Sequence, residues 1–294
     1  MNDQSLLSTS ATIIIAAYNE SSVIRQTLAR LGENNLPDQY QILVVCNGCT
    51  DNTEEIVRNE FRNVHCLSLA KASKALAIRH AESLNPGFPR LYLDADIILS
   101  AEDAVSLIAL LRDQESAALL IPSSKILTSS SSTSVQRFYR YWYSTRHVQD
   151  SGYGAGTYLL NQQGRGRFGS WPDLVADDAF IRSQFSFDEI RLEKSINVEV
   201  KAPKNLWSLI KVKTRSKFGN IELKAYLEDR QTDSRNHKTN HRTKKDPRPL
   251  LSSGDSANWC DQITYILVNL VALGMAKWQL VNGKKKWLRD NSNR

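Results

Sequence analysis

The chain has 294 residues, of which 41% are apolar and 23% charged, so a buried core is available and disorder of the whole chain is not expected. This length fits one large domain, or one domain with a smaller appendage. The formal net charge of +7 suits nucleic acid, anionic lipid and phosphate-bearing substrates equally well, so charge alone selects no partner.

The first third of the chain alternates apolar runs with segments of helical spacing. The runs predict strands at Thr12–Ala17, Gln41–Cys46, His65–Leu69 and Arg90–Leu93. Helices are expected between them, the third over Ser73–Ser83. Alternating strands and helices indicate an α/β fold with a mainly parallel sheet flanked by helices, in which functional residues gather at the carboxyl ends of the strands. At or just beyond those ends lie Tyr18, Asn47, Lys74 and Asp94.

The later part of the chain is less regular. Another apolar run predicts a strand at Ala117–Ile121. Asp229–Pro249 contains no apolar residue, so we expect a solvated linker or loop there. Ile263–Val281 is strongly apolar with helical character, and the basic run Lys284–Lys286 follows it.

The cysteine pattern and the N-terminus bear on the cellular compartment. Cys46 and Cys49 have metal-like spacing, but no second CxxC or His pair completes a zinc site. The spacing also fits a redox pair, whereas the intervening Asn47-Gly48 is typical of an ordinary turn, and we expect free thiols in a reducing compartment. Because residues 1–10 carry no basic region followed by an apolar one, we expect no secretion and a cytoplasmic location.

The acidic motif Asp94-Ala95-Asp96 directly follows an apolar strand. If the strand breaks into a loop there, both carboxylates can approach one divalent cation, and hard oxygen ligands suit Mg²⁺ or Mn²⁺. Such a cation neutralises a diphosphate leaving group. The alternative is that Asp94 only ends the strand and Asp96 only caps the next helix.

Several short motifs occur in a fixed order around this acidic pair. AAYNE follows the first strand, VVCNGCTDNT the second, and ASKALAIRHA precedes the acidic motif, while a second acidic pair, ADD, follows about eighty residues later. This order resembles glycosyltransferase family 2 over roughly Thr12–Gly219, and the tail WLRDNSNR is similar to the C-terminus of bacterial polysaccharide-synthesis members. The resemblance implies the GT-A fold and an inverting, hexosyltransferase-like glycosyltransferase, with a C-terminal helical extension.

The resemblance also implies roles for individual residues of the first half. It assigns to nucleotide-sugar binding Ala17, Tyr18, Glu20, Asn47, Asp51, Lys74 and Asp94. Asp96 is expected to be the more direct metal ligand of the DxD pair, with Mn²⁺ or Mg²⁺ as the cofactor. Cys46 and Asn47 stand where many relatives have acidic residues that contact uracil, so the base of the donor stays open.

In the second half, Asp178 matches the catalytic aspartate of the family, and Asp177 is expected to orient it. The chemistry asks for such a residue independently, because an inverting transfer needs a base that removes the proton of the acceptor hydroxyl. The alternative is that both aspartates cap a helix that begins at Ala179. Arg215 lies in the basic segment LIKVKTRSKFGN, which resembles the family's basic motif, and the resemblance assigns it to nucleotide-sugar binding. The alternative for this segment is an exposed strand face. Trp171 fits either stacking on a sugar or packing beneath its loop.

These expectations define three segments. Residues 1–220 form the nucleotide-sugar glycosyltransferase domain, residues 221–258 a polar basic linker or loop, and residues 259–294 an apolar and basic helix with a tail. The helix either lies on a membrane surface, at the inner face of the cytoplasmic membrane, or docks on the catalytic domain. The expected partners are a nucleotide-sugar donor and a saccharide or lipid-linked acceptor, with no specific nucleic acid. We expect the product to be a cell-surface polysaccharide or a glycolipid.

Rivals from other classes are weaker on the sequence. An aspartate-dependent phosphohydrolase also places D-x-D after a strand, but usually after the first one. An oxidoreductase would carry GxGxxG after its first strand, and none is present. A basic nucleic-acid-binding protein would use the charges of Arg230–Arg248, which no aromatic residue interleaves for stacking.

Overall fold

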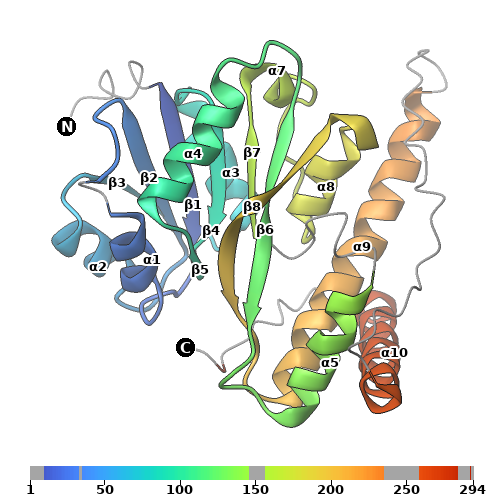
Figure 1. Ribbon diagram of the computed structural model, residues 1–294. Coiled ribbons are helices and arrows are strands. Elements are labelled where there is room, and N and C mark those ends of the chain that lie inside the picture. Colours follow the sequence, from blue (N-terminus) through green and yellow to red (C-terminus); the bar gives the residue numbers. More distant parts are fainter. Residues whose placement is uncertain (1–9, 33–34, 146–155, 235–257, 284–291, 293–294) are drawn as a thin grey trace. The chain divides into compact units, whose positions relative to one another are not determined.

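The computed structural model describes residues 10–32, 35–145, 156–234, 258–283 and 292 (Figure 1). The chain divides into two compact units, and each is described by itself. Unit 1 falls within Met1–Lys125, Gly154–Asp173 and Asp188–Val200. Unit 2 falls within Ile126–Tyr153, Leu174–Phe187 and Lys201–Arg294.

An eight-stranded sheet has the strand order β3-β2-β1-β4-β7-β6-β8-β5 (Figure 1). Its parallel part consists of β1 (Ala11–Ala17), β2 (Tyr40–Asn47), β3 (Val64–Leu69) and β4 (Arg90–Asp94). The other strands are β5 (Ile97–Ile98), β6 (Leu119–Leu127), β7 (Thr157–Leu160) and β8 (Ile190–Lys201). β7 runs antiparallel to β4 and β6, and β8 runs antiparallel to β5, so the sheet is mixed beyond its parallel part.

The parallel strands are buried because helices cover both faces of the sheet. Every residue of β2 is buried, and in β1 Ile13 pairs with Ile42 at zero and 2% exposure. The covering helices are α1 (Ile24–Leu31), α2 (Thr53–Glu60), α3 (Lys74–Ser83) and α4 (Ala101–Arg112). α3 contacts β1 and β2, and Figure 1 shows α4 on the opposite face. The four strands and the helix over Ser73–Ser83 predicted from the sequence are therefore confirmed.

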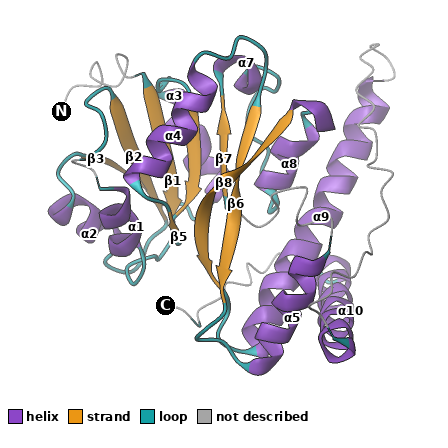
Figure 2. Ribbon diagram, in the orientation of Figure 1, coloured by secondary structure: helices purple, strands orange, loops and turns teal. Residues whose placement is uncertain are grey.

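Unit 2 is mainly helical (Figure 2). Its helices are α5 (Thr133–Ser144), α8 (Asp177–Ser183), α9 (Leu206–Ser234) and α10 (Trp259–Val281). Two short elements of the chain are α7 (Gln162–Arg165) and the 3₁₀ turn η2 (Phe187–Glu189). Val135 and Phe138 of α5 pack with Leu209 of α9 and Val268 of α10 to form a hydrophobic core.

The predicted linker at 221–258 does not begin as a loop. Residues 221–234 continue α9, so the loop expectation is wrong for them, and residues 235–257 lie outside the described part of the chain. The composition of 221–228 explains the difference, because its Glu, Leu, Lys and Ala are strong helix formers. Lys224 and Glu228, one helical turn apart, also form an ion pair at 3.8 Å.

The apolar C-terminal segment forms the predicted helix, α10, which packs on α5 and α9 by one face. Asp261 in its first turn is fully buried, and both its carboxylate oxygens lie 3.0 Å from Nη1 of Arg140. Asn258 and Asp261 form a capping box at the start of the helix. By length and composition α10 is also long and apolar enough to cross a membrane.

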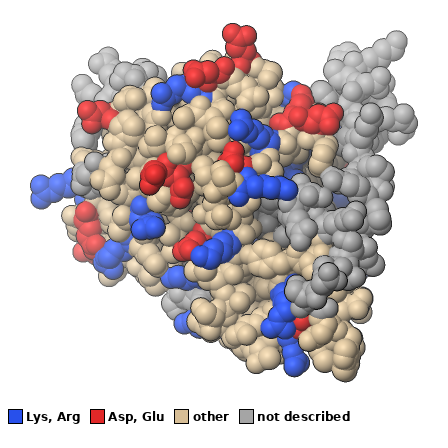
Figure 3. Space-filling model, viewed as in Figure 1, with Lys and Arg blue, Asp and Glu red and all other residues tan. Residues whose placement is uncertain are grey.

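Charged side chains of both signs are interspersed on the face seen in Figure 3. Lys and Arg form no continuous basic patch among the described residues visible there.

Candidate active site

The carboxyl ends of β1, β2, β3 and β4 lie at one edge of the sheet in unit 1, because these four strands are parallel. The chain leaves that edge at Ala17, Asn47, Leu69 and Asp94. Seven of the residues predicted for donor binding, from Ala17 to Asp94, therefore belong to this edge or to the turns just beyond it. The structure brings this part of the predicted site together.

The acidic motif lies where β4 ends. Asp94 is the last residue of β4, Ala95 is 3% exposed, and Asp96 is exposed in the turn before β5. The carbonyl oxygen of Ala95 accepts a hydrogen bond from Thr27 Oγ1 at 2.8 Å, which fixes the turn. The strand thus breaks between the two carboxylates, as a shared cation would require.

Gly156, which precedes β7, lies close to Asp94. Its carbonyl oxygen accepts a hydrogen bond from the Asp94 N–H at 2.9 Å. A Cβ atom at position 156 would lie 3.0 Å from Oδ2 of Asp94, and the φ angle of +55° favours glycine there. The glycine therefore leaves open the space beside the Asp94 carboxylate.

The donor atoms of this motif fit a hard divalent cation. Asp94 and Asp96 supply carboxylate oxygens, and within the described ranges no cluster of three His, Cys, Asp or Glu side chains is spaced to hold a metal ion. A cation here would take its other ligands from phosphate and water. Mg²⁺ is commonly held in this way, by one or two carboxylates plus substrate phosphates.

Lys74 contributes positive charge beside the acidic motif. Its Nζ lies 2.6 Å from Oδ1 of Asp94, and both side chains are partly exposed. Lys74 is the first residue of α3, whose N-cap Ser73 accepts a hydrogen bond from the Leu76 N–H at 3.2 Å. The N-terminus of a helix favours anions, so an amine and a helix end lie together at this edge.

The Asn47 side chain lies inside the fold, at the end of β2. It is 2% exposed, and its Nδ2 donates to the Ala17 carbonyl oxygen at 2.8 Å. Its Oδ1 accepts from the Ser73 N–H at 3.0 Å. Asn47 thus connects the end of β1 to the start of α3 from inside the fold. The next residue, Gly48, has a φ of +62° and lies against the backbone of Ala72.

Asp51 fixes the turn after β2 to the turn after β1. Its Oδ2 accepts from the Ser21 N–H at 3.1 Å, and its Oδ1 accepts from the Thr53 N–H at 3.0 Å. Burial by itself raises the pKa of the Asp51 carboxyl, but hydrogen bonds from Thr53 and Ser21 outweigh it and hold that pKa below its usual value. Glu20 is 8% exposed, and its N–H donates to Thr53 Oγ1 at 2.7 Å. Tyr18 is half-buried.

Trp171 is 1% exposed, so of the two interpretations the sequence left open, packing holds and sugar stacking does not. Its ring lies 5.1 Å from that of Tyr92 and 5.0 Å from that of Phe168. Arg79 of α3 donates to the Trp171 carbonyl oxygen at 2.8 Å. The loop around Trp171 is therefore attached to the helix that begins at Lys74.

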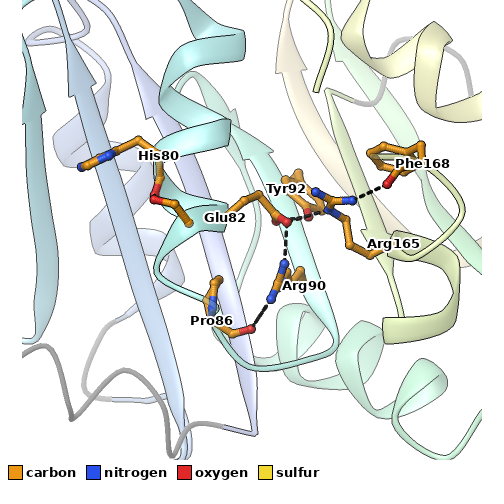
Figure 4. Close-up of polar contacts among 8 residues, drawn as sticks. His80, Glu82, Pro86, Arg90, Tyr92, Arg165 and Phe168 are labelled. Carbon is orange, nitrogen blue, oxygen red and sulfur yellow. Dashed lines mark hydrogen bonds and ion pairs between the residues drawn. The ribbon is translucent and has the colours of Figure 1, made fainter. Parts of the chain in front are cut away.

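A buried charge cluster supports the same loop (Figure 4). Oε2 of Glu82 lies 2.5 Å from Nη1 of Arg90 and 2.6 Å from Nε of Arg165, and Tyr92 donates to Oε1 at 2.6 Å. Arg165 also donates to the carbonyl oxygen of Phe168 at 2.8 Å. Burial, and next the charge of Glu82, raise the pKa of the Tyr92 hydroxyl, so it stays protonated. The sequence patterns did not indicate this cluster.

Asp177 and Asp178 lie in unit 2, in the first turn of α8. Asp177 is 5% exposed, whereas Asp178 is exposed and its Oδ1 accepts from the Ala179 N–H at 2.7 Å. The helix begins at Asp177, with Ala176 at its N-cap position. The alternative in which both aspartates cap a helix placed its start two residues later, at Ala179. The meeting of this pair with Asp94 and Asp96 in one cleft stays a prediction.

Two residues of α9 that the sequence patterns did not single out hold the chain before α8. Glu222 accepts from the Val175 N–H at 2.8 Å. A Cβ atom at Gly219 would lie 2.9 Å from the Cβ of Ala176, so only glycine allows this approach without a shift. Arg215 is half-buried one turn earlier on the same helix, which makes the strand-face alternative wrong for its segment. The sequence signal was the glycine of Phe-Gly-Asn, which follows a basic run. It indicates a close approach between two chain segments only if the run is known to be helical.

A family model and a set of solved structures both match this chain. A sequence model of the family described as glycosyl transferase family 2 matches residues 12–158, half of the 294-residue chain. No curated protein matches the sequence significantly.

Solved structures of similar fold include a mannosyltransferase and TarS. A mannosyltransferase from Pyrobaculum calidifontis, in complex with GDP-Man and Mn²⁺, is 16% identical with a TM-score of 0.59 over 93% of this chain and 74% of that one. TarS 1-349 from S. aureus, in complex with UDP, is 16% identical with a TM-score of 0.50 over 66% of this chain and 60% of that one. At these identities the likeness shows the fold alone.

Proposed function

Because the chain belongs to glycosyl transferase family 2, and is therefore a glycosyltransferase of GT-A fold, we propose that it transfers a sugar from a nucleoside-diphosphate sugar to an acceptor hydroxyl with inversion. The observation that carries the proposal is the break of β4 between Asp94 and Asp96, with the Lys74 amine 2.6 Å from the first carboxylate. Opposite charges are thus placed where a diphosphate and its cation would bind.

On the donor side, Asp94 and Asp96 would hold Mn²⁺ or Mg²⁺, which when bound supplies positive charge to the departing diphosphate. Lys74 and the N-terminus of α3 add to the positive potential at the same edge. Tyr18, Glu20 and Asp51 line or support the nucleotide pocket beside β1. Asn47 positions the walls of that pocket, because its side-chain amide is hydrogen-bonded to the Ala17 carbonyl oxygen and to the Ser73 N–H.

On the acceptor side, Asp178 removes the proton of the attacking hydroxyl. The new bond forms between the acceptor oxygen and the anomeric carbon while the bond from that carbon to the diphosphate oxygen breaks. The hydrogen bond from the Ala179 N–H orients Oδ1. Asp177, nearly buried beside it, has an orienting role. Arg215 serves as a further phosphate-directed cation on α9.

The neighbours support a nucleotide-sugar donor in general terms. The mannosyltransferase was solved with GDP-Man and Mn²⁺, and TarS with UDP. We place this chain's product among cell-surface polysaccharides or glycolipids on the resemblance of its tail to polysaccharide-synthesis members of the family. A thermal-shift panel of GDP and UDP, with and without Mn²⁺, tests the donor: stabilisation by one nucleotide only with metal supports the proposal, and none by any nucleotide contradicts it.

The two rival functions have no support. The acidic motif follows β4 rather than the first strand, which is unlike an aspartyl phosphohydrolase. Most of Arg230–Arg248, the stretch that a nucleic-acid-binding role would use, lies outside the described residues.

We also propose that α10 contacts an anionic membrane surface. Its packed face contains Asp261, Val268, Ala272 and Gln279, spaced at whole turns of a helix. The opposite face exposes large apolar side chains, including Trp259 at 72%, Leu270 at 60% and Trp278 at 57%. The charged Asp261 and the polar Asn269 favour a helix lying in the interface over one that crosses the bilayer.

The charge pattern complements such a surface. Lys277 is exposed on α10, and the sequence continues into Lys284–Lys286. Each basic residue near an anionic surface contributes on the order of 1 kcal/mol, and added salt weakens this term. The location proposed for the chain is therefore the inner face of the cytoplasmic membrane, where anionic lipids and lipid-linked acceptors meet.

Vesicle sedimentation tests this contact with a matched pair of variants on exposed positions. Leu270→Glu removes apolar surface from the exposed face and should lower the bound fraction by ~10-fold, the effect of a lost buried leucine. Gln262→Glu adds the same charge at an exposed polar position and should change binding little. Equal binding by both variants and by a chain truncated before Asn258 would show that the helix is only structural.

A further inference from the structure

A lysine of α9 lies among the aromatic rings of α5. The Nζ atom of Lys213 is 5.0 Å from the ring centre of Phe138 and 5.5 Å from the ring centres of Tyr139 and Trp142. All four residues belong to unit 2, in which α5, α9 and α10 pack together (Figure 1). The rings attract the ammonium group through their π faces, but a ring face offers its N–H groups no strong hydrogen-bond acceptor.

The charge of Lys213 has no counter-ion in the described part of the chain. Its amine forms no ion pair or hydrogen bond with a described residue, and neither does the amine of Lys217, one turn further along α9. Burial first, and the charge of Lys217 after it, lower the pKa of Lys213 to about 8, so most molecules still carry the proton at neutral pH. By contrast, the fully buried Asp261 of the same unit is paired with Arg140 at 3.0 Å. Because a buried charge is costly unless it is paired, we expect an anion to bind beside Lys213.

The surroundings of Lys213 also bear on what carries this anion. Tyr265 of α10 stacks on Phe138 with the ring centres 5.1 Å apart, and Tyr265 and Trp142 are partly exposed, so the aromatic cluster extends from the amine to the surface. An inorganic phosphate would give up its hydration beside these rings and gain no apolar contact. A phosphate on an alkyl chain would pair with the amine and also bury apolar surface on the rings.

We propose that Lys213 and Lys217 bind the phosphate group of a ligand whose apolar chain lies against Phe138 and Trp142. The two lysines are four residues apart and project from the same side of α9, where one phosphate can bridge them. Arg215, assigned to nucleotide-sugar binding, is two residues from Lys213 and therefore about 200° around the helix. The lysine site thus faces away from that cation, and the acceptor is the substrate that it fits. This last step rests on the proposed function, whereas binding of the phosphate does not.

Isothermal titration of the full chain with octyl phosphate, without donor or metal and below the micelle concentration, tests the site. We expect octyl phosphate to bind at least ~10-fold more tightly than inorganic phosphate or octanol, because each of those lacks one of the two contacts. Equal binding of octanol would show only an apolar surface, and equal binding of inorganic phosphate only a charged one. Either result would overturn the proposal.

Variants on α9 assign the binding to Lys213. Lys213→Met should weaken octyl phosphate binding by ~10-fold or more, the effect of a lost charged hydrogen bond, and Lys213→Arg should keep most of it. Methionine packs well against aromatic rings, so the variant should fold, which its thermal unfolding checks. Lys224→Met is the matched control and should change nothing, since the Lys224 side chain is 77% exposed and lies 3.8 Å from Glu228. Equal losses in both methionine variants, or none in either, would refute the site.

Amine acetylation followed by peptide mapping gives a second measurement that needs no variant. Octyl phosphate should slow the acetylation of Lys213 and leave that of Lys224 unaffected, and an unchanged rate at Lys213 would contradict the proposal. Titrations of the same chain with UDP and GDP separate the two claims. Nucleotide binding without octyl phosphate binding would refute the lysine site alone, and octyl phosphate binding without nucleotide binding would refute the proposed function alone.

Discussion

Replacing Asp178 by Asn separates a catalytic role from a structural one. Asn keeps the size and an Oδ1 that can accept from the Ala179 N–H, now at 2.7 Å, but it cannot take the proton of an acceptor hydroxyl. We expect turnover to fall by ~10²-fold or more, which corresponds to about 2.7 kcal/mol in the activation barrier. The lost charge at the start of α8 should cost no more than about 1 kcal/mol of stability.

Initial rates of sugar transfer and thermal unfolding, measured on the same preparations, distinguish the two effects. Donor affinity should survive in Asp178→Asn, because Asp178 is not among the residues assigned to the donor, and those from Ala17 to Asp96 lie in the other unit. Asp177→Asn is the matched control: its side chain is 5% exposed, so it should lose more stability and less turnover. Equal and mild losses of turnover in both variants would refute the assignment of the base and favour the capping interpretation.

Two further predictions concern the framework of the site. Arg90→Met should lower the free energy of unfolding in urea by about 3 kcal/mol, because it leaves the buried Glu82 with one cation fewer, and a loss below about 1 kcal/mol would contradict the account. Asp51→Asn should destabilise the chain at neutral pH, because the folded-state pKa of Asp51 lies below its ordinary value of 3.8. The ionised carboxylate therefore contributes stability that is fully present above pH 3.8. The difference from the wild type should shrink as the pH falls through the lowered pKa, and a difference that grows toward acid would show the wrong sign.

The sequence predicted the elements whose causes are local. β1 and β2 are apolar on both faces, so their runs indicated buried parallel strands. The helical spacing of the segment after the third strand likewise indicated α3. The acidic motif was found for the same reason, because a strand and the residues after it are neighbours in the chain.

The features that the sequence missed or left open depend on distant parts of the chain. The inward orientation of Asn47 is decided by Ala17 and Ser73, and the burial of Trp171 is decided by Tyr92 and Phe168. The antiparallel placement of β7 between β4 and β6 is a pairing that no local pattern specifies. Residues 221–234 belong to α9 instead of the predicted linker or loop, because residues 221–228 are rich in strong helix formers.

The central claim is a cation-dependent nucleotide-sugar site at Asp94 and Asp96, and nucleotide binding with and without Mn²⁺ tests it most directly. Titration of the wild type with its preferred nucleoside diphosphate should show binding that Mn²⁺ strengthens and excess chelator abolishes. Asp96→Ala should keep the thermal stability of the wild type, because Asp96 is exposed, and its residual binding should not respond to Mn²⁺. Metal-stimulated binding that persists in Asp96→Ala, or full transferase activity in excess chelator, would contradict the account.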